Sequence, residues 1–354
     1  MDLDLLKSKF RGTMLGVLVG DILGSPYEAK KVISGRKKIY LQRRLDTLEG
    51  TKFREPIMEF TDDSAMTRSL AESLIEKRDL DIVDIAKRFV ESYYQEPDRG
   101  YGAGSISVLE KLKELTNKKI EPGIDVKGPA KDIFGGTGSY GNGGAMKIAP
   151  ISLFSYNNYD NLLHYVKEVT EITHAHELGI NGAILQAIAI QQSLSLHPSE
   201  ELNVSDFIDD LINKMDKIEV DESQINRSQP YKERLKIIKN LLPETGDNPN
   251  EKRVIEELGN NVRALESVPT AIFCFLKAQR CIKKIRTNNP VRRAIQYAIT
   301  LGGDTDTIAS MTGAIAGAFY GHEKFSRLLL SHCEQADRFE ELADALLDVA
   351  TSKT

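Results

Sequence analysis

Apolar residues recur three and four positions apart along most of the chain, the spacing that places them on one face of an α-helix. Strict alternation of apolar and polar residues, the pattern of a half-buried strand, is almost absent. The pattern therefore predicts an all-α fold. The expected helices are Leu5–Leu23, Asp63–Lys77, Ile82–Tyr94, Gly104–Leu115, Asn158–Ile172, Gly179–Leu196, Val204–Met215, Tyr231–Leu242, Asn250–Leu258, Val268–Lys283, Pro290–Thr300, Ile308–Tyr320, His322–Gln335 and Arg338–Val349.

Three segments interrupt the helical pattern. Lys30–Glu59 is basic and irregular, Asn117–Gly144 is rich in glycine and proline, and Pro198–Pro249 is strongly charged. None of them is expected to link two domains, because candidate chemical motifs lie on both sides of all three. The prediction is one domain over residues 5–350, in which residues 198–249 form a peripheral helical insertion.

Two of the predicted helices carry small residues at intervals of four. These are Gly12, Gly16, Gly20 and Gly24 in the first helix, and Ala309, Gly313, Gly317 and Gly321 in the second. A glycine inside a helix costs about 1 kcal/mol relative to alanine, so such a stripe needs a compensating contact. We expect the two helices to be buried and tightly packed at the centre of the molecule. A chance clustering of small residues is the alternative.

The composition narrows the class of protein without changing the fold prediction. The chain has 354 residues, with 47 Lys and Arg against 52 Asp and Glu, and a net charge of −5. A surface that binds DNA directly would be basic, so no direct DNA binding is expected. No segment approaches the roughly 18 apolar residues that a membrane-spanning helix requires, so no membrane association is expected either.

The cysteines and the first four residues indicate the kind of cellular compartment in which the protein is found. Cys274, Cys281 and Cys333 are scattered and fit no zinc-binding spacing. The sequence begins Met1-Asp2-Leu3-Asp4, which is acidic where secretory and transit peptides are basic. These features favour a soluble protein in a reducing compartment.

Two acidic turns, Thr61–Ser64 and Asp304–Thr307, each precede a predicted helix. Both contain residues that cap helix N-termini, and capping alone is the alternative explanation for each turn. Two aspartates in one turn exceed what a cap needs, and Thr307 adds a hydroxyl beside Asp304. If the turns face each other, their carboxylates repel unless cations lie between them. Oxygen donors without His or Cys suit Mg²⁺, Mn²⁺ or Ca²⁺ rather than zinc.

The glycine-dense segment Phe134–Gly144 is a candidate phosphate-binding loop. It contains a G-x-G-x-x-G motif, but the preceding residues hold glycine and proline and predict no strand, which argues against a dinucleotide-binding βαβ unit. Glycines nevertheless let backbone N–H groups approach phosphate oxygens. Phe134 and Tyr140 offer aromatic faces for a base. A flexible surface loop is the alternative.

Two further positions carry candidate chemistry. Glu28 follows the first small-residue helix in a loop, where it is either a mobile acid near the cations or simply a solvated side chain. His174 and His176 stand two residues apart, a spacing that diverges on a helix, so a shared metal is not expected. One of these histidines is expected to contact a ligand or to cap a helix.

These five segments, in this order, resemble the ADP-ribosylglycohydrolase family, and the likeness runs from about Arg11 to Gly321. Within the family the sequence is most similar to the ADP-ribosylhydrolase three branch, and Pro198–Pro249 matches least well. The resemblance implies a compact single-domain orthogonal helix bundle with two Mg²⁺ ions per chain, for which Mn²⁺ is a substitute. The segments that carry the branch-level likeness are Asp98–Gly104, Gly138–Met146, Asn181–Gln186, Glu266–Ala271 and Gly302–Thr307.

The resemblance also implies a role for each site residue. One magnesium would be held by Thr61, Asp62, Asp63 and Asp306, and the second by Glu28, Asp304, Asp306 and Thr307. The implied substrate-binding residues are Asp62, Gly100, Gly102, Phe134, Gly138, Ser139, Tyr140, Gly141, Asn142, Gly143, His174 and Val262. Among them, the backbone of residues 138–143 would hold the diphosphate, and Phe134, Tyr140 and Val262 would surround the adenine.

The implied activity is hydrolysis of the O-glycosidic bond that joins ADP-ribose to serine, and of poly(ADP-ribose) and O-acetyl-ADP-ribose. Such cleavage passes through an oxocarbenium-like state, in which a carboxylate assists proton transfer. Glu28 is the predicted acid–base residue, and Asp62 is the competing candidate. The alternatives are hydrolysis of ADP-ribosyl-arginine and a non-catalytic protein, either an ADP-ribose reader or a crystallin-like structural relative.

The resemblance finally implies partners and a location. The partners are ADP-ribosylated proteins, poly(ADP-ribose) and free ADP-ribose, in the setting of the DNA damage response, and the protein is expected to be a monomer. The expected location is the cytoplasm and the nucleus. Mitochondria are the alternative, although no transit peptide is visible.

Overall fold

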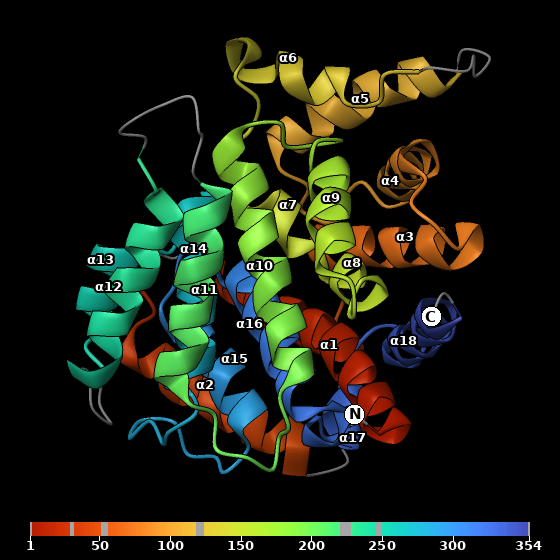
Figure 1. The fold of residues 1–354 in the computed structure, drawn as a ribbon. Coiled ribbons are helices and arrows are strands. Elements are labelled where there is room, and N and C mark those ends of the chain that lie inside the picture. The colour runs from red at the N-terminus through yellow and green to blue at the C-terminus, as the bar shows by residue number, and fades with distance from the viewer. Residues whose placement is uncertain are drawn as a thin grey trace.

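The computed structural model describes residues 2–28, 32–50, 56–117, 124–219, 228–244 and 249–352. Within these ranges every regular element is a helix, and pairing between extended segments is limited to two isolated bridges (Figure 1). The predicted all-α fold is confirmed. None of the described helices combines the length and the apolar character needed to cross a membrane.

Two helices, α1 (Leu3–Gly24) and α16 (Thr305–Tyr320), pack together at the centre of the molecule (Figure 1). Their small residues face each other in antiparallel order. A methyl group built on Gly16 would lie 2.0 Å from the carbonyl oxygen of Gly313, and one built on Gly20 would lie 2.2 Å from that of Ala309. The two backbones are therefore in direct contact, which confirms the packing predicted from the stripes. The C-terminal end of α1 consequently lies beside the N-terminal end of α16.

Four helices pack around the central pair and share its core. They are α10 (Glu177–Ser195), α14 (Ala264–Lys277), α15 (Pro290–Thr300) and α18 (Ala336–Thr351). Helix α15 illustrates how local sequence begins such an element. The Asn289 side chain accepts hydrogen bonds from the first N–H groups of the helix, and Pro290 occupies the first turn, where no N–H is needed.

Seven helices cover the part of the molecule drawn at the upper right of Figure 1. They are α3 (Asp62–Lys77), α4 (Ile82–Gln95), α5 (Ala103–Asn117), α6 (Gly128–Gly136), α7 (Gly143–Met146), α8 (Ala149–Phe154) and α9 (Tyr159–Thr170). Helix α3 packs against α1 and α18, and α4 packs against α3. The start of α3 is thereby brought to the central pair.

The opposite side carries α11 (Val204–Ile218), α12 (Pro230–Glu244) and α13 (Glu251–Leu258). Helix α11 packs against α10 and α12, and α12 packs against α14. Residues 220–227 and 245–248 of the expected insertion lie outside the described residues. The domain limits and the peripheral character of residues 198–249 stay predictions.

The short helices α6, α7 and α8 were not predicted, and three further helix predictions are wrong in the described residues. The segment expected to be irregular contains α2 (Gly35–Gly50), an amphipathic helix that buries only three leucines, so its apolar face is narrow. Helix α14 begins at Ala264 rather than Val268 and ends at Lys277, and it accommodates Pro269 within the helix. The helix expected over residues 322–335 is broken into η2 (His322–Lys324) and α17 (Arg327–Leu330), because Ser326 caps a new helix start.

Candidate active site

The first acidic turn is held against α1 by the buried carboxylate of Asp21. Its Oδ1 accepts a hydrogen bond from the Thr61 hydroxyl (2.8 Å), and its Oδ2 accepts the N–H (3.1 Å) and the hydroxyl (2.6 Å) of Ser64. The Thr61 N–H lies 3.1 Å from both carboxylate oxygens. Asp21 therefore satisfies the N–H groups at the start of α3, where the Thr61 side chain makes no capping bond. The carboxylates of Asp62 and Asp63 are therefore not needed as helix caps.

The second acidic turn begins α16 and lies against the end of α1. A methyl group built on Gly24 would lie 2.4 Å from the Cα atom of Asp306, so the last glycine of the stripe allows the two helix ends to meet. The Thr305 hydroxyl donates to the carbonyl oxygen of Gly24 (2.9 Å). A single 3-10 turn, η1 (Ser25–Tyr27), follows Gly24, and Glu28 comes directly after it. The glycine contact therefore brings Glu28 to the start of α16.

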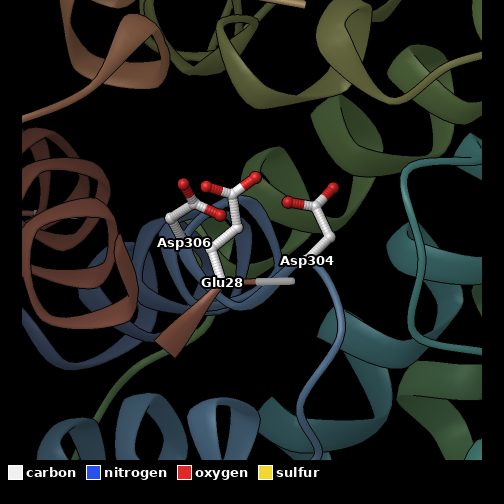
Figure 2. A group of neighbouring side chains, drawn as sticks. All are labelled: Glu28, Asp304 and Asp306. Carbon is white, nitrogen blue, oxygen red and sulfur yellow. The ribbon is translucent and has the colours of Figure 1, made fainter. Parts of the chain in front are cut away.

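Three carboxylates meet at this junction. One oxygen each from Glu28, Asp304 and Asp306 lies within 4.8 Å of the other two. Figure 2 shows the three side chains directed into the same space, two from the start of α16 and Glu28 from the segment that follows α1. The two acidic turns are also in contact, because the Thr307 hydroxyl donates to Oδ2 of Asp63 (3.3 Å). The turns that the sequence predicts to face each other do so.

Burial and mutual repulsion raise the pKa values of these carboxylates. Burial, followed by the charges of Asp21 and Asp304, raises the pKa of Asp62 to about 8. Burial, followed by the charges of Asp304 and Glu28, raises the pKa of Asp306 to about 10. The same two causes, burial and then Asp304, raise the pKa of Glu28. Without a positive partner, the cluster therefore favours protonated carboxyl groups near neutral pH.

The donor set fits a hard divalent cation. Oδ1 of Asp63 is buried and has no hydrogen-bond donor in the described part of the chain. Burial, and then the charges of Asp21 and Asp306, raise the pKa of Asp63 well above its usual value. A cation would pair with this oxygen and offset the repulsion. Carboxylates with the hydroxyls of Thr61 and Thr307 are all-oxygen ligands, so these residues could hold Mg²⁺, Mn²⁺ or Ca²⁺ between the two turns.

The glycine-rich loop is tied to the segment that precedes α14. The Asn142 N–H donates to the carbonyl oxygen of Val262 (2.9 Å), and the Ala264 N–H donates to that of Tyr140 (3.1 Å). These two bonds form the isolated antiparallel bridge at Gly141. Val262, chosen from the sequence far from the loop, therefore lies directly beside it.

Only part of the loop backbone is available to a ligand. The N–H groups of Gly138, Gly141 and Asn142 all donate to acceptors within the protein. The N–H groups of Ser139 and Tyr140 at the tip of the loop, and that of Gly143 at the start of α7, have no acceptor among the described residues. The structure therefore narrows the expected phosphate donors to these three N–H groups.

The side chain of Asn142 joins the loop to the metal centre. Its Nδ2 donates to Oδ2 of Asp304 (2.6 Å) and to the Ser267 hydroxyl (3.1 Å). Asn142 is a predicted substrate-binding residue, but in the structure its main-chain N–H and its side-chain Nδ2 both donate to other residues of the protein. Asn142 therefore orients a carboxylate of the metal centre from the glycine loop.

Three exposed apolar side chains border the loop. The exposed fractions are 62% for Phe134, 44% for Tyr140 and 62% for Val262. Phe134 has a left-handed backbone (φ 54°), and its ring lies over Gly104 at the start of α5, 3.2 Å from a methyl group built there. The Arg263 guanidinium lies 5.7 Å from the centre of the Tyr140 ring. Three exposed apolar side chains next to free N–H groups suit a ligand with an aromatic base and a phosphate.

The two histidines have separate roles. His174 is buried, and a methyl group built on Gly143 would lie 2.6 Å from its ring. Burial, and then the charge of Lys147, lower the pKa of His174 well below its usual value, so the ring is neutral near pH 7. Nδ1 of His176 accepts the N–H of Leu178 (3.0 Å) and caps α10. One histidine therefore faces the glycine loop and the other is a helix cap.

The loop that precedes α5 passes beside the first acidic turn. The Asp62 N–H donates to the carbonyl oxygen of Arg99 (2.8 Å), and the Arg99 guanidinium pairs with Glu334 (2.7 Å). Gly100 has φ +87°, and a methyl group there would lie 4.0 Å from Oδ1 of Asp62. At Gly102 nothing lies within 4 Å of such a methyl group, so the chain borders open space there.

Two buried charged residues of the site were not predicted. Asp21 interrupts the apolar run of the first small-residue helix, and a buried acid of this kind requires partners, so a signal was present. Nζ of Lys147 donates to the carbonyl oxygen of Gly143 (2.6 Å) and to the Thr173 hydroxyl (2.7 Å). Nothing local in the sequence separates Lys147 from an ordinary surface lysine.

Comparison with known proteins gives concordant results. A sequence model described as ADP-ribosylglycohydrolase matches residues 2–354. The proteins named ADP-ribosylhydrolase ARH3 from Mus musculus and Homo sapiens are 41% and 40% identical to this chain, each over 96% of it and over 91% and 93% of their own lengths. A solved chain titled "ADP-ribosylglycohydrolase-related protein complex" superposes with a TM-score of 0.68 at 22% identity, covering 98% of this chain and 100% of that one. That structure shares the fold.

Proposed function

The chain belongs to the ADP-ribosylglycohydrolase family and is an ADP-ribosyl hydrolase, and we propose that it cleaves the O-glycosidic bond between ADP-ribose and serine with two bound magnesium ions. Poly(ADP-ribose) and O-acetyl-ADP-ribose are further proposed substrates. The observation that carries the proposal is the meeting of Glu28, Asp304 and Asp306 within 4.8 Å beside the turn that contains Asp62 and Asp63.

Asp306 is the proposed bridge between the two ions. We propose that one ion is held by Thr61, Asp62, Asp63 and Asp306, and the other by Glu28, Asp304, Asp306 and Thr307. Bound magnesium supplies positive charge that polarises ribose hydroxyls and helps to orient a water, and Mn²⁺ can replace it. The orphaned Oδ1 of Asp63 and the raised pKa of Asp306 support this assignment.

Glu28 is the proposed acid–base residue. It is exposed, so we propose that it ligates the second ion in one state and leaves that ion in another, in which its raised pKa favours retention of a proton that it can deliver to the leaving oxygen. Asp62 is the competing candidate, because its pKa is raised to about 8 and it lies beside the loop at Gly100. The two residues differ in accessibility, since Glu28 is the more exposed of the two.

The remaining residues would bind the product part of the substrate. The free N–H groups of Ser139 and Tyr140 would donate to the diphosphate, and the exposed rings of Phe134 and Tyr140 with Val262 would hold the adenine. The choice of serine over arginine rests on the resemblance of the loop over residues 138–142 to the serine-acting branch.

One experiment tests the reaction and the linkage together. Peptides ADP-ribosylated on serine or on arginine are incubated with the protein in Mg²⁺ or in EDTA, and free ADP-ribose is followed by mass spectrometry. We expect release from the serine peptide only, and only with Mg²⁺. Release from the arginine peptide instead would favour the alternative linkage. Binding of ADP-ribose without release from either peptide would favour a non-catalytic reader.

A further inference from the structure

Behind the glycine loop, three buried side chains form a chain of hydrogen bonds that none of the roles above uses. Lys147 is 0% exposed, Thr173 1% and His174 5%. Nζ of Lys147 lies 2.7 Å from the Thr173 hydroxyl, and that hydroxyl lies 2.8 Å from Nδ1 of His174. Nζ also donates to the carbonyl oxygen of Gly143, which fixes the lysine at the base of the loop.

The directions of these bonds follow from the chemistry of the groups. A carbonyl oxygen only accepts, and Nζ carries at least two protons in either charge state, so it can donate both to Gly143 and to Thr173. The Thr173 oxygen then accepts from Lys147, and its own proton is left for Nδ1 of His174. With the ammonium form of Lys147, which has no lone pair, the opposite arrangement with a proton on Nδ1 would leave the buried threonine proton without an acceptor among the described residues. A neutral imidazole whose Nδ1 accepts carries its proton on Nε2.

Nε2 faces the glycine loop. A methyl group built on Gly143 would lie 2.8 Å from Nε2, and one built on Gly141 would lie 3.4 Å from it. Nε2 has no hydrogen-bond partner among the described residues. The ring is held neutral by burial and by the nearby Lys147, which lower the pKa of His174. A fixed N–H donor therefore points toward the part of the loop that carries the free N–H groups of Ser139 and Tyr140.

We propose that Lys147 and Thr173 are positioning residues that hold His174 as the Nε2–H tautomer, which donates to an oxygen of ADP-ribose bound on the glycine loop. The identity of the ligand rests on the proposed function, whereas the tautomer does not. An imidazole with a free lone pair at Nε2 would instead repel a phosphate oxygen at this position.

The tautomer is measured first, in ligand-free protein with ¹⁵N-labelled histidine, by long-range ¹H–¹⁵N correlation. His176 is an internal reference. Its Nδ1 accepts a backbone N–H, so the neutral ring must carry its proton on Nε2. We expect the same Nε2–H signature for His174 in the wild type and in Thr173→Ser. In Thr173→Val, which keeps the shape but lacks the hydroxyl, and in Lys147→Met, we expect a mixture of tautomers. An Nδ1–H signature in the wild type overturns the proposal even if both of these variants fail to fold.

The functional consequence is measured by calorimetry with ADP-ribose and Mg²⁺. We expect the dissociation constant to rise by roughly tenfold in Thr173→Val, the scale of one lost hydrogen bond, and to stay near the wild-type value in Thr173→Ser. Equal affinities in Thr173→Val and Thr173→Ser would overturn the proposed contact. If the wild type does not bind ADP-ribose at all, the proposed function fails, while the tautomer measurement still decides the role of Lys147 and Thr173.

Discussion

The carboxylate of Asp21 caps a helix other than its own, because its Oδ2 accepts both the N–H and the hydroxyl of Ser64 in the first turn of α3. Asp21 lies one residue beyond Gly20, whose contact with α16 fixes that part of α1. One short stretch of α1 therefore sets the positions of both acidic turns. The distance between the two sets of carboxylates is determined by backbone contact on one side and by a buried hydrogen-bond network on the other.

Replacing Asp21 should loosen the first turn and weaken the metal centre together. In Asp21→Ala the buried donors of Thr61 and Ser64 lose their acceptor, so we expect the free energy of unfolding to fall by roughly 2–4 kcal/mol. Magnesium affinity should fall as well, because Asp62 and Asp63 are no longer anchored. Denaturant unfolding in EDTA and magnesium calorimetry measure the two effects.

Ser69→Ala is the matched control for that prediction. The Ser69 hydroxyl is also buried on α3, but it bonds only to the carbonyl oxygen of Ala65 in its own helix. We expect a loss of about 1 kcal/mol or less and unchanged magnesium affinity. If Asp21→Ala and Ser69→Ala behave alike, Asp21 has no special role in placing the acidic turn.

Asp306→Asn should separate metal binding from stability. Without metal the Asp306 carboxyl, whose pKa is raised to about 10, keeps its proton near neutral pH, so replacing it with a neutral amide should leave the metal-free variant about as stable as the wild type. The wild type should gain about 2.7 kcal/mol for each bound ion at a magnesium concentration 100-fold above the dissociation constant, and the variant should gain almost nothing. Thermal unfolding with and without Mg²⁺ measures both, with the exposed Glu110→Gln on α5 as control. Two normal magnesium sites in Asp306→Asn would contradict the bridging role.

Removal of metal should make stability depend more steeply on pH. Asp62 and Asp306 have folded-state pKa values of about 8 and about 10, raised above the usual 3.8, so the folded state binds protons more tightly than the unfolded chain. The stability that these groups contribute is complete below about pH 4 and is lost as the pH rises through those folded values. His174 and Lys147 have lowered pKa values and act in the opposite direction, but they are not among the proposed magnesium ligands, so they contribute with and without the ion.

The measurement that isolates this effect is a difference between two melting temperatures. At each pH the protein is melted in Mg²⁺ and in EDTA, so that groups outside the metal centre cancel. We expect the difference to widen from about pH 5 to about pH 8, because the ion replaces protons on the carboxylates. A difference that stays constant or narrows with rising pH would argue against metal binding at Asp62 and Asp306.

The parts of the structure that were predictable are those in which a local pattern has one physical cause. Small residues at every fourth position have little reason to recur except backbone contact, and Gly16 and Gly313 make that contact. Two adjacent aspartates at a helix start signal more than a cap, and the two turns do converge. Helix α2 escaped prediction because it buries only three leucines, so its periodic signal is weak.

Other features depend on partners that are distant in the sequence. Asn142 was expected to bind substrate as part of the glycine loop, and no local pattern indicated that its side-chain amide would donate to Asp304, 162 positions away. Nζ of Lys147 is satisfied by the carbonyl oxygen of Gly143, four residues earlier, and by the Thr173 hydroxyl, 26 positions away, and the second of these partners cannot be recognised from the sequence around the lysine. Such contacts depend on how the helices pack together, and they produce no periodic pattern in the sequence.

Phe134→Ala should weaken ADP-ribose binding without affecting the metal. The ring is 62% exposed and lies over Gly104, so its removal should cost little stability. Loss of stacking on a base costs about 1–3 kcal/mol, so the dissociation constant should rise by roughly 5- to 150-fold. Calorimetry with ADP-ribose measures this, and Ile39→Ala, an exposed apolar side chain on α2, is the control. An unchanged dissociation constant would assign the adenine to another surface.

Glu28→Gln should separate catalysis from binding at the metal centre. The amide keeps the size of the side chain but cannot carry the proton that a carboxyl with a raised pKa delivers. General acid–base assistance contributes roughly 10²–10⁴-fold, so turnover should fall by that factor while ADP-ribose affinity changes little. Release of ADP-ribose from the serine-linked peptide is followed alongside Glu114→Gln, an exposed glutamate on α5, as control. Near-normal turnover in Glu28→Gln would transfer the acid–base role to Asp62, which lies beside the loop at Gly100.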